Sequence, residues 1–159
     1  MQISLNWLKD YVDLDVSVEE LCERLTMLGL EIEKVTEPGK EISGVVIGQI
    51  LSIDPHPDAD NLVVCRTDTG GEAPLQIVCG AKNFKAGDRV PLAVPGTVFP
   101  GGLTIKESKI RGELSQGMMC SGRELGVSED HEGLMILPAD TPLGRPIQEI
   151  FPSDTVLEL

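Results

Sequence analysis

The sequence lacks any long apolar run and is poor in aromatic and basic side chains. Of its 159 residues only 3% are aromatic, and 13 Lys or Arg stand against 26 Asp or Glu. No stretch approaches the roughly 20 consecutive apolar residues that a membrane-spanning helix needs, and residues 1–4 lack the charged and apolar regions of a signal peptide. We therefore expect a cytoplasmic protein with no membrane partner.

Catalytic and metal-binding patterns are also missing. The four cysteines, Cys22, Cys65, Cys79 and Cys120, lie far apart with no Cys-x-x-Cys pair, which excludes zinc-ribbon spacing. Each stands among apolar neighbours, so we expect buried free thiols. No Ser-His-Asp set, P-loop or metal cluster is present, and we expect no catalytic residue, metal site or cofactor in this chain.

The charge balance argues against a general attraction to RNA. The net charge is −13 and the pI is near 4.4, whereas phosphate binding usually requires a positive surface. One window differs, because residues 82–111 hold six basic and two acidic residues, while residues 1–40 hold four basic and nine acidic ones. An RNA contact, if there is one, is expected on this window.

Two short helices are predicted before residue 30. Apolar residues recur at helical spacing over residues 4–12, which predicts a helix capped by Ser4 with Trp7 as a core anchor. A second helix begins at a capping box, Ser17 to Glu20, and ends before Gly29, a residue suited to a left-handed cap. Its apolar stripe consists of Val18, Leu21, Leu25 and Leu28.

After residue 43 the pattern changes to short apolar segments separated by Gly and Pro. Five or so short strands without a long helix predict an OB-type barrel. The predicted strands cover residues 45–53, 62–67, 75–79, 90–94, 103–110 and 117–120, with one more in 130–137, and the turn signals include Pro100-Gly101-Gly102.

A further strand is predicted at each side of this region. Residues 30–35 alternate between apolar and polar, residues 37–40 break the pattern, and residues 155–159 alternate again. Pairing of the two outer strands predicts a mainly β protein in which an OB-fold barrel is inserted into a small α/β N-terminal module. The expected parts are residues 1–39, the barrel at 40–150 and a truncated return strand at 151–159, so we expect a fragment of a longer protein.

Two histidines lie beside acidic residues. His56 is flanked by two prolines and followed by two aspartates, as an acid–base or metal site would be, but the prolines favour a rigid loop with an Asx-type turn. His131, between Asp130 and Glu132, is interpreted as a solvated turn residue.

Several motifs point to a known family. They are Gln76-Ile77-Val78-Cys79-Gly80-Ala81-x-Asn83, Pro95-Gly96-x-Val98-x-Pro100-Gly101, Lys109-x-Arg111-Gly112 and Ser115-x-Gly117-Met118-Met119-Cys120-Ser121-x-x-Glu124-Leu125-Gly126. Together they resemble the tRNA-binding OB domain that several aminoacyl-tRNA synthetases and their accessory proteins share. The opening, Ile3-Ser4-x-x-Trp7-Leu8 followed by Leu28-Gly29-Leu30-Glu31-Ile32-Glu33, resembles specifically the N-terminus of the bacterial phenylalanyl-tRNA synthetase β subunits, and the resemblance spans essentially the whole chain.

The resemblance implies a role in a larger ligase of protein biosynthesis. The β subunits of that family are several times longer and work in an α2β2 heterotetramer that uses ATP and Mg²⁺ to charge tRNA-Phe with phenylalanine. The family's aminoacylation site lies on the α subunit and its editing site in a later part of β. The implied partners are therefore tRNA-Phe, the α subunit and the rest of the β subunit, with no catalytic site in this chain.

Two interpretations stay open for the barrel. In the first it binds tRNA through phosphate contacts that position the RNA without reading its sequence; the expected residues are Lys82, Asn83, Lys85, Arg89, Lys106, Lys109, Arg111 and Arg123. In the second it is an architectural module that contacts other parts of the synthetase through the apolar stripe of the second helix or the barrel rim.

Two details weaken the first interpretation. The family loop commonly reads His-Pro-Asn-Ala-Asp-Lys-Leu, whereas this chain has Asp58 and Asn61, which make the loop more negative. In addition, strand alternation would place Lys106 and Lys109 on opposite faces, so not all of the basic residues can share one patch.

Overall fold

The computed structural model describes residues 1–38, 42–99, 101–127, 129, 131–151 and 154–159. The chain divides into two compact units: unit 1 comprises Met1–Lys40 and Pro152–Leu159, and unit 2 comprises Glu41–Phe151. Within the described ranges no helix is both long and apolar enough to cross a bilayer. Three features singled out in the sequence lie outside the described residues: the end of the break at 39–40, Pro100 in its turn, and Asp130.

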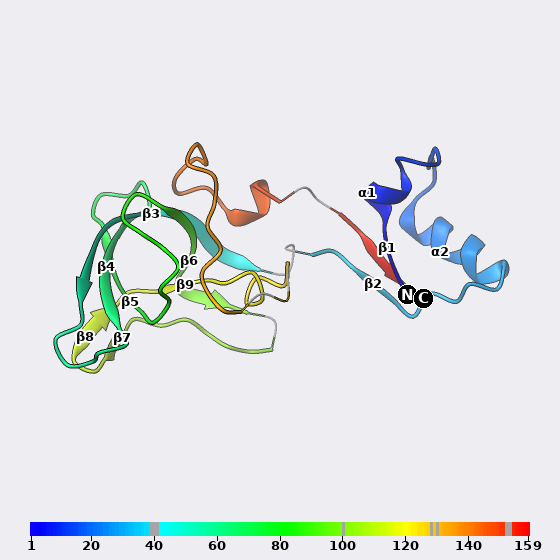
Figure 1. The fold of residues 1–159 in the computed structure, drawn as a ribbon. Coiled ribbons are helices and arrows are strands. Elements are labelled where there is room, and N and C mark those ends of the chain that lie inside the picture. Colours follow the sequence, from blue (N-terminus) through cyan, green and yellow to red (C-terminus); the bar gives the residue numbers. More distant parts are fainter. Residues whose placement is uncertain (39–41, 100, 128, 130, 152–153) are drawn as a thin grey trace. The chain divides into compact units, whose positions relative to one another are not determined.

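Unit 1 is a three-stranded antiparallel sheet with two helices. Its elements are β1 (Gln2–Ser4), α1 (Leu5–Leu8), α2 (Val18–Met27), β2 (Lys34–Thr36) and β10 (Val156–Glu158), in the strand order β1-β10-β2 (Figure 1). The predicted pairing of the last strand with the strand near residue 35 is confirmed, because Leu157 lies opposite Val35. Strand β1 was not predicted, since three residues are too few to show an alternation.

Helix α1 begins as predicted and ends early. The Ser4 hydroxyl accepts a hydrogen bond from the Trp7 amide at 3.1 Å, but the helix stops at Leu8. The prediction that Trp7 anchors the core is wrong: its side chain is 56% exposed and packs edge-on against Tyr11, with 5.2 Å between ring centroids. A helix of one turn buries one face, and Leu5 occupies that face.

Helix α2 has the predicted caps at both ends. The Ser17 hydroxyl accepts from the Glu20 amide at 3.2 Å. At the other end Gly29 has φ +90°, its N–H donates to Thr26 O at 3.0 Å, and the Leu30 N–H donates to Leu25 O at 2.9 Å. These two bonds form a Schellman motif. Because Leu30 takes part in it, the following strand begins at Lys34 rather than at residue 30.

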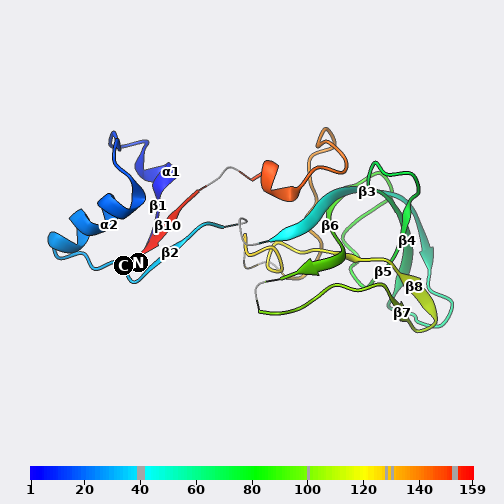
Figure 2. The same cartoon turned by 180° about the vertical axis from the view of Figure 1, so that it is seen from behind.

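Unit 2 is built on a curled five-stranded antiparallel sheet in the order β5-β4-β3-β6-β9, with β7 and β8 as a separate hairpin (Figures 1 and 2). This half-barrel confirms the predicted mainly β, OB-like fold inserted into the N-terminal module. Its elements are β3 (Ser43–Pro55), β4 (Val63–Asp68), β5 (Leu75–Cys79), β6 (Arg89–Val98), β7 (Ser108–Ile110), β8 (Glu113–Ser115), β9 (Met118–Met119) and the 3-10 helix η1 (Ile147–Glu149).

A β-bulge allows the long strand β3 to place side chains in the core on both sides of the bulge. Pairing with β4 shifts between Ile50 and Ser52, and Leu51 at the shift is 48% exposed. The extra residue allows Ile50 and Ile53, three positions apart, both to face inward, and it bends the strand. Ile50 joins a buried cluster with Cys65, Ile77, Val90, Leu92, Met119 and Leu134.

Two predicted strands of unit 2 are shorter or absent. The strand expected over 103–110 is limited to β7 at residues 108–110, and β8 after it was missed. The strand expected within 130–137 is wrong, since the described part of this segment has no strand and Leu137 forms only an isolated bridge with Arg89. This segment is held by single backbone hydrogen bonds, from the Met135 N–H to Cys120 O and from the Leu137 N–H to Arg89 O, and by side chains instead of a β-ladder.

Candidate nucleic-acid interface

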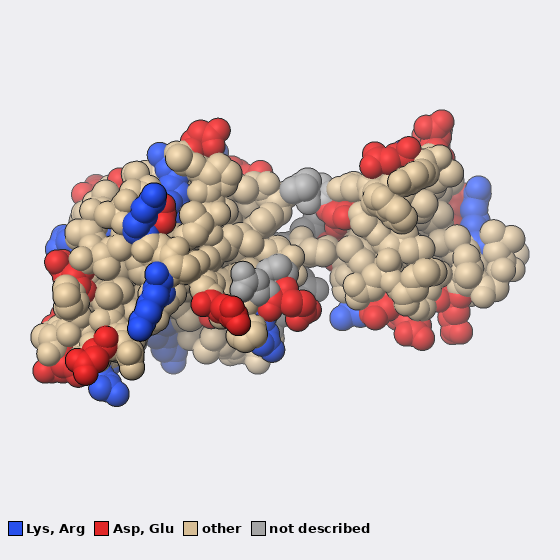
Figure 3. All heavy atoms as spheres, viewed as in Figure 1, with Lys and Arg blue, Asp and Glu red and all other residues tan. Residues whose placement is uncertain are grey.

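The six exposed cations of unit 2 that the sequence reasoning named lie in three separate places. Two are in the loop between β5 and β6, three are in or beside the β7–β8 hairpin, and one is in the turn at 121–127. They are Lys82, Lys85, Lys106, Lys109, Arg111 and Arg123. On the face seen in Figure 3 the Lys and Arg atoms of unit 2 are scattered points among neutral surface, with acidic residues between them.

Asn83 uses its amide group within the chain. Its Nδ2 donates to Leu134 O at 2.8 Å, and its Oδ1 accepts from the Leu134 N–H at 2.9 Å. Gly133 leaves room for this contact, because a Cβ at that position would lie 2.5 Å from the Asn83 Cγ. The side chain therefore replaces a β-ladder partner for the segment at 131–137.

Arg89 is half-buried and also engaged internally. Its Nη1 donates to the Thr141 carbonyl, and its backbone carbonyl accepts from the Leu137 N–H at 2.8 Å. The Nε is buried and has no hydrogen-bond partner among the described residues. The guanidinium thus ties the segment at 137–141 to strand β6 and is poorly placed to reach a ligand.

The β7–β8 hairpin is fixed to strand β5 by side-chain and backbone hydrogen bonds. The Gln76 side chain donates to Leu114 O at 2.9 Å. The Gln76 N–H donates to Gln116 Oε1 at 3.0 Å, and the Gln116 N–H donates to Gln76 O at 2.7 Å. The Ser115 hydroxyl accepts from the Val78 N–H at 3.1 Å. Lys109 and Arg111 are therefore exposed on a firmly held support.

His56 connects the loop after β3 to the tip of this hairpin. The ring is 5% exposed; its Nδ1 accepts from the Asp58 N–H at 3.0 Å and its Nε2 lies 2.9 Å from Ile110 O. The prediction of a rigid loop is supported by both contacts. His131 is exposed, as predicted, and its Nδ1 lies 3.4 Å from Glu129 O.

The sequence reasoning did not name two exposed cations of unit 2, Arg66 and Arg145, and Arg66 lies close to the hairpin. Arg66 is the outward residue of β4 between buried Cys65 and Thr67, and its Cα partners are Ser52 and Gln76. Gln76 in turn contacts the β7–β8 hairpin, so Arg66 lies on the sheet face nearest to that hairpin's attachment. The alternation of buried and exposed positions along 63–68 was the signal that could have found it.

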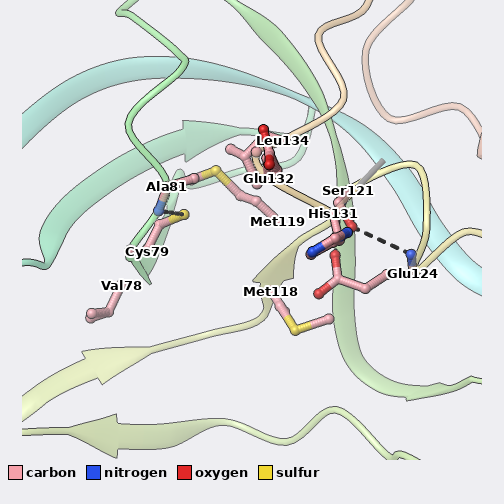
Figure 4. Close-up of a pocket in the computed structure, with 12 residues that line it drawn as sticks. Val78, Cys79, Ala81, Met118, Met119, Ser121, Glu124, His131, Glu132 and Leu134 are labelled. Carbon is pink, nitrogen blue, oxygen red and sulfur yellow. Dashed lines mark hydrogen bonds between the residues drawn. The ribbon is translucent and has the colours of Figure 1, made fainter. Parts of the chain in front are cut away.

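A cavity of about 370 Å³ lies between the end of β5, strand β9 and the segment at 131–134. Figure 4 shows Met119 pointing toward Ala81 and Cys79, while His131 and Glu124 lie on the other side. The Ser121 hydroxyl accepts from the Glu124 N–H at 3.4 Å, and the Glu124 carboxylate accepts from the Ser121 N–H. This reciprocal capping box holds the turn that closes the cavity.

The thiols of unit 2 are unsuited to nucleophilic chemistry. Burial raises the pKa of Cys65 and of Cys120 from the ordinary 9.0 to about 12, and burial likewise raises the pKa of Cys79 in the cavity wall. A thiol that stays protonated is a poor nucleophile. Cys22 and Cys79 are half-buried, so the prediction of buried thiols is confirmed for two of the four cysteines.

The comparisons with known proteins match this geometry to a family. Residues 45–146 match the family model described as "Putative tRNA binding domain", which spans strands β3 to β9. The chain belongs to this family. The match covers the half-barrel, its hairpin and the cavity, so the tRNA-binding domain is essentially unit 2.

Relatives are similar to the whole chain. The phenylalanine–tRNA ligase beta subunit of Syntrophus aciditrophicus is 52% identical over 160 residues, covering 100% of this chain and 20% of that protein. The beta subunit of Anaeromyxobacter dehalogenans is 54% identical over 157 residues, covering 99% and 20%. The chain therefore spans about a fifth of the length of these relatives. Among solved structures, the C-terminal domain of Plasmodium vivax p43 has a TM-score of 0.48 at 22% identity, covering 65% of this chain and 58% of that one.

Proposed function

We propose that this chain is the N-terminal tRNA-binding region of a phenylalanine–tRNA ligase beta subunit. The observation that carries the proposal is the identity of about half of all residues, over the entire chain, to beta subunits of that ligase. In this proposal residues 40–150 form the tRNA-binding OB-fold domain, while residues 1–39 and 151–159 are parts of one N-terminal module.

Seven exposed cations of unit 2 are the proposed RNA contacts, and Arg145, which pairs with Glu149 at 3.8 Å, is not among them. Lys109 and Arg111 on the hairpin, with Arg66 on the adjacent sheet face, would form the main group, and Lys82, Lys85, Lys106 and Arg123 would be secondary. Asn83 and Arg89 are left out of the proposed interface because their polar groups hold the chain's own loops. These contacts would meet phosphates and position the RNA.

The activity of the whole ligase belongs to the proposal as well. The complete enzyme would charge tRNA-Phe with phenylalanine in the cytoplasm, as an α2β2 heterotetramer with the α subunit, using ATP and Mg²⁺. This chain does not suit either cofactor. Among its described residues no group of three or more His, Cys, Asp or Glu is placed to hold a metal ion, and Glu124 and Glu132 in the cavity wall would repel a triphosphate.

Fluorescence anisotropy with labelled tRNA-Phe and a non-cognate tRNA, over a range of salt concentrations, tests the proposal. We expect binding to both tRNAs. The logarithm of the association constant should fall linearly with the logarithm of the salt concentration, because phosphate contacts release counterions. The control is Arg24→Gln in unit 1. The Arg24 side chain pairs with Glu20, and its replacement should not affect tRNA binding. Lack of binding at low salt would contradict tRNA binding by this region.

An exposed apolar groove favours an architectural role as the second candidate. A groove of about 490 Å³ in unit 1 is lined by Cys22, Glu23, Thr26, Met27, Ile32 and Val35, and Met27 and the adjacent Leu28 are 88% and 79% exposed. Because the chain is about a fifth of its relatives, the remainder of the beta subunit is the proposed occupant. Calorimetric titration of this chain with that remainder would detect the contact, and Met27→Glu should abolish it; no heat of binding would contradict this role.

A further inference from the structure

Arg111 has a backbone conformation that disfavours arginine. It is the one described residue other than glycine with a positive φ, at +49°, and Gly112 follows with φ +89°. Because Ile110 pairs directly with Glu113, these two residues form a two-residue hairpin loop with positive φ at both positions, as in a type I′ turn. Asn, Asp and Gly suit the first position far better than Arg.

The Arg111 side chain contributes nothing visible to the fold. It is exposed, and within the described ranges its guanidinium makes no hydrogen bond or ion pair. A residue that is disfavoured by its backbone and unused by its own chain indicates selection for an external contact. A guanidinium offers donors in a planar fork that matches two phosphate oxygens.

The His56 side chain anchors the turn through a hydrogen bond to the Ile110 carbonyl. Since its Nδ1 accepts from the Asp58 N–H, the ring proton is on Nε2, which donates to Ile110 O at the start of the turn. The Nδ1 of this buried side chain thus bonds within the loop after β3, and the Nε2 connects that loop to the residue before Arg111. The loop at 56–60 also carries Asp58 and Asp60, so the tip suits one close phosphate contact rather than a long positive track.

We propose that the Arg111 guanidinium binds a single backbone phosphate of the RNA and that His56 is the positioning residue for this contact. The proposal deepens the tRNA-binding function and rests on it. It assigns a role to the His56 loop, whose Asp58 and Asp60 disfavour a direct phosphate contact: the loop acts through the backbone carbonyl of Ile110.

The test compares Arg111→Asn with Arg145→Asn in the 159-residue chain. Asn suits a left-handed position, so the urea midpoint of Arg111→Asn should stay level or rise. Its tRNA affinity should fall about tenfold. The slope of log affinity against log salt concentration should decrease in magnitude by about one, as expected for the loss of one phosphate contact. Arg145 is exposed near η1 and loses the same charge, so a smaller effect there separates the specific contact from net charge.

A double-mutant cycle tests the role of His56. His56→Gln should weaken tRNA binding severalfold in the parent chain and have no further effect in the Arg111→Asn background, because it acts only through that contact. Equal effects in both backgrounds would overturn the positioning role. His56→Ala, compared by hydrogen exchange at residues 108–115, provides a second measurement: faster exchange in the hairpin is expected, and unchanged protection would count against the clamp.

The outcomes separate this inference from the function on which it rests. If the parent chain does not bind tRNA, the proposed function fails. If the parent binds and Arg111→Asn binds equally well, the function stands and the Arg111 contact is overturned.

Discussion

At the residue scale, side chains that look like ligands are often used by the fold. Asn83 and Arg89 belong to the basic window from which an RNA site is expected, yet each bonds to a backbone group more than 50 residues away in sequence. The segment at 131–141 has no strand, so single backbone bonds such as Leu137 N–H to Arg89 O, and the side chains of Asn83 and Arg89, satisfy its backbone. Composition alone does not distinguish such a role from binding, because the same polar group serves both.

Asn83→Ala should lower the free energy of unfolding of unit 2 by about 1–3 kcal/mol. The change removes both hydrogen bonds to Leu134, which is only 8% exposed, and leaves its N–H and C=O without their partner. Urea unfolding followed by circular dichroism measures the effect. Lys82→Ala at the exposed neighbouring position is the control and should change stability by no more than about 0.5 kcal/mol; equal effects would contradict the role of Asn83.

At the element scale, local hydrogen bonds decide where elements begin and end. The caps of α2 are encoded within a few residues, and Ser17 and Gly29 lie where the capping pattern predicts them. The β7–β8 hairpin is different. Its strands have three residues each, and its position is set by Gln76 and His56, which are distant in sequence.

Gly29→Ala should destabilise unit 1 by about 1 kcal/mol, whereas Gly29→Asn should cost less. A Cβ at this position would have no atom within 4 Å, so the whole effect comes from the backbone at φ +90° and not from a clash. Asn tolerates that conformation better than Ala does. Thermal unfolding of both variants provides the comparison, and a larger loss for Asn would argue against this explanation.

At the scale of the whole molecule, the chain forms two units with separate cores. Unit 1 depends on β10, which pairs with β1 on one side and β2 on the other and buries Leu157 completely. Unit 2 has its own buried clusters on the curled sheet. The acidic balance of the chain is shared by both units, so the proposed RNA contact depends on single exposed cations and not on a net positive field.

Leu157→Ala should destabilise unit 1 by about 2–5 kcal/mol and leave unit 2 folded. Leu157 is fully buried at the centre of the three-stranded sheet, and its removal leaves a cavity between β1 and β2. Hydrogen exchange should increase in β1 and β2 but not in β3 to β6. Leu28→Ala is the matched control, because the same side chain is removed from a position that is 79% exposed; loss of protection in both units would show that they do not fold independently.

The sequence by itself determined the features whose causes are local. Caps, turns and alternating apolar positions fixed α2, the strand β5 and the mainly β class, because each depends on residues within a few positions of one another. The family motifs then identified the tRNA-binding domain. The prediction for Trp7 failed because helical spacing shows that a residue can face inward but not how much core there is for it to contact.

Only the tertiary structure decided which polar residues remain available to a ligand. Asn83 and Arg89 are used by loops that return from far along the chain, and Arg66 becomes a candidate because β4 turns it outward beside the hairpin. The link between His56 and the turn of Arg111 spans 54 residues to Ile110. Such long-range hydrogen bonds depend on how the sheet curls, and no local pattern of residues records that geometry.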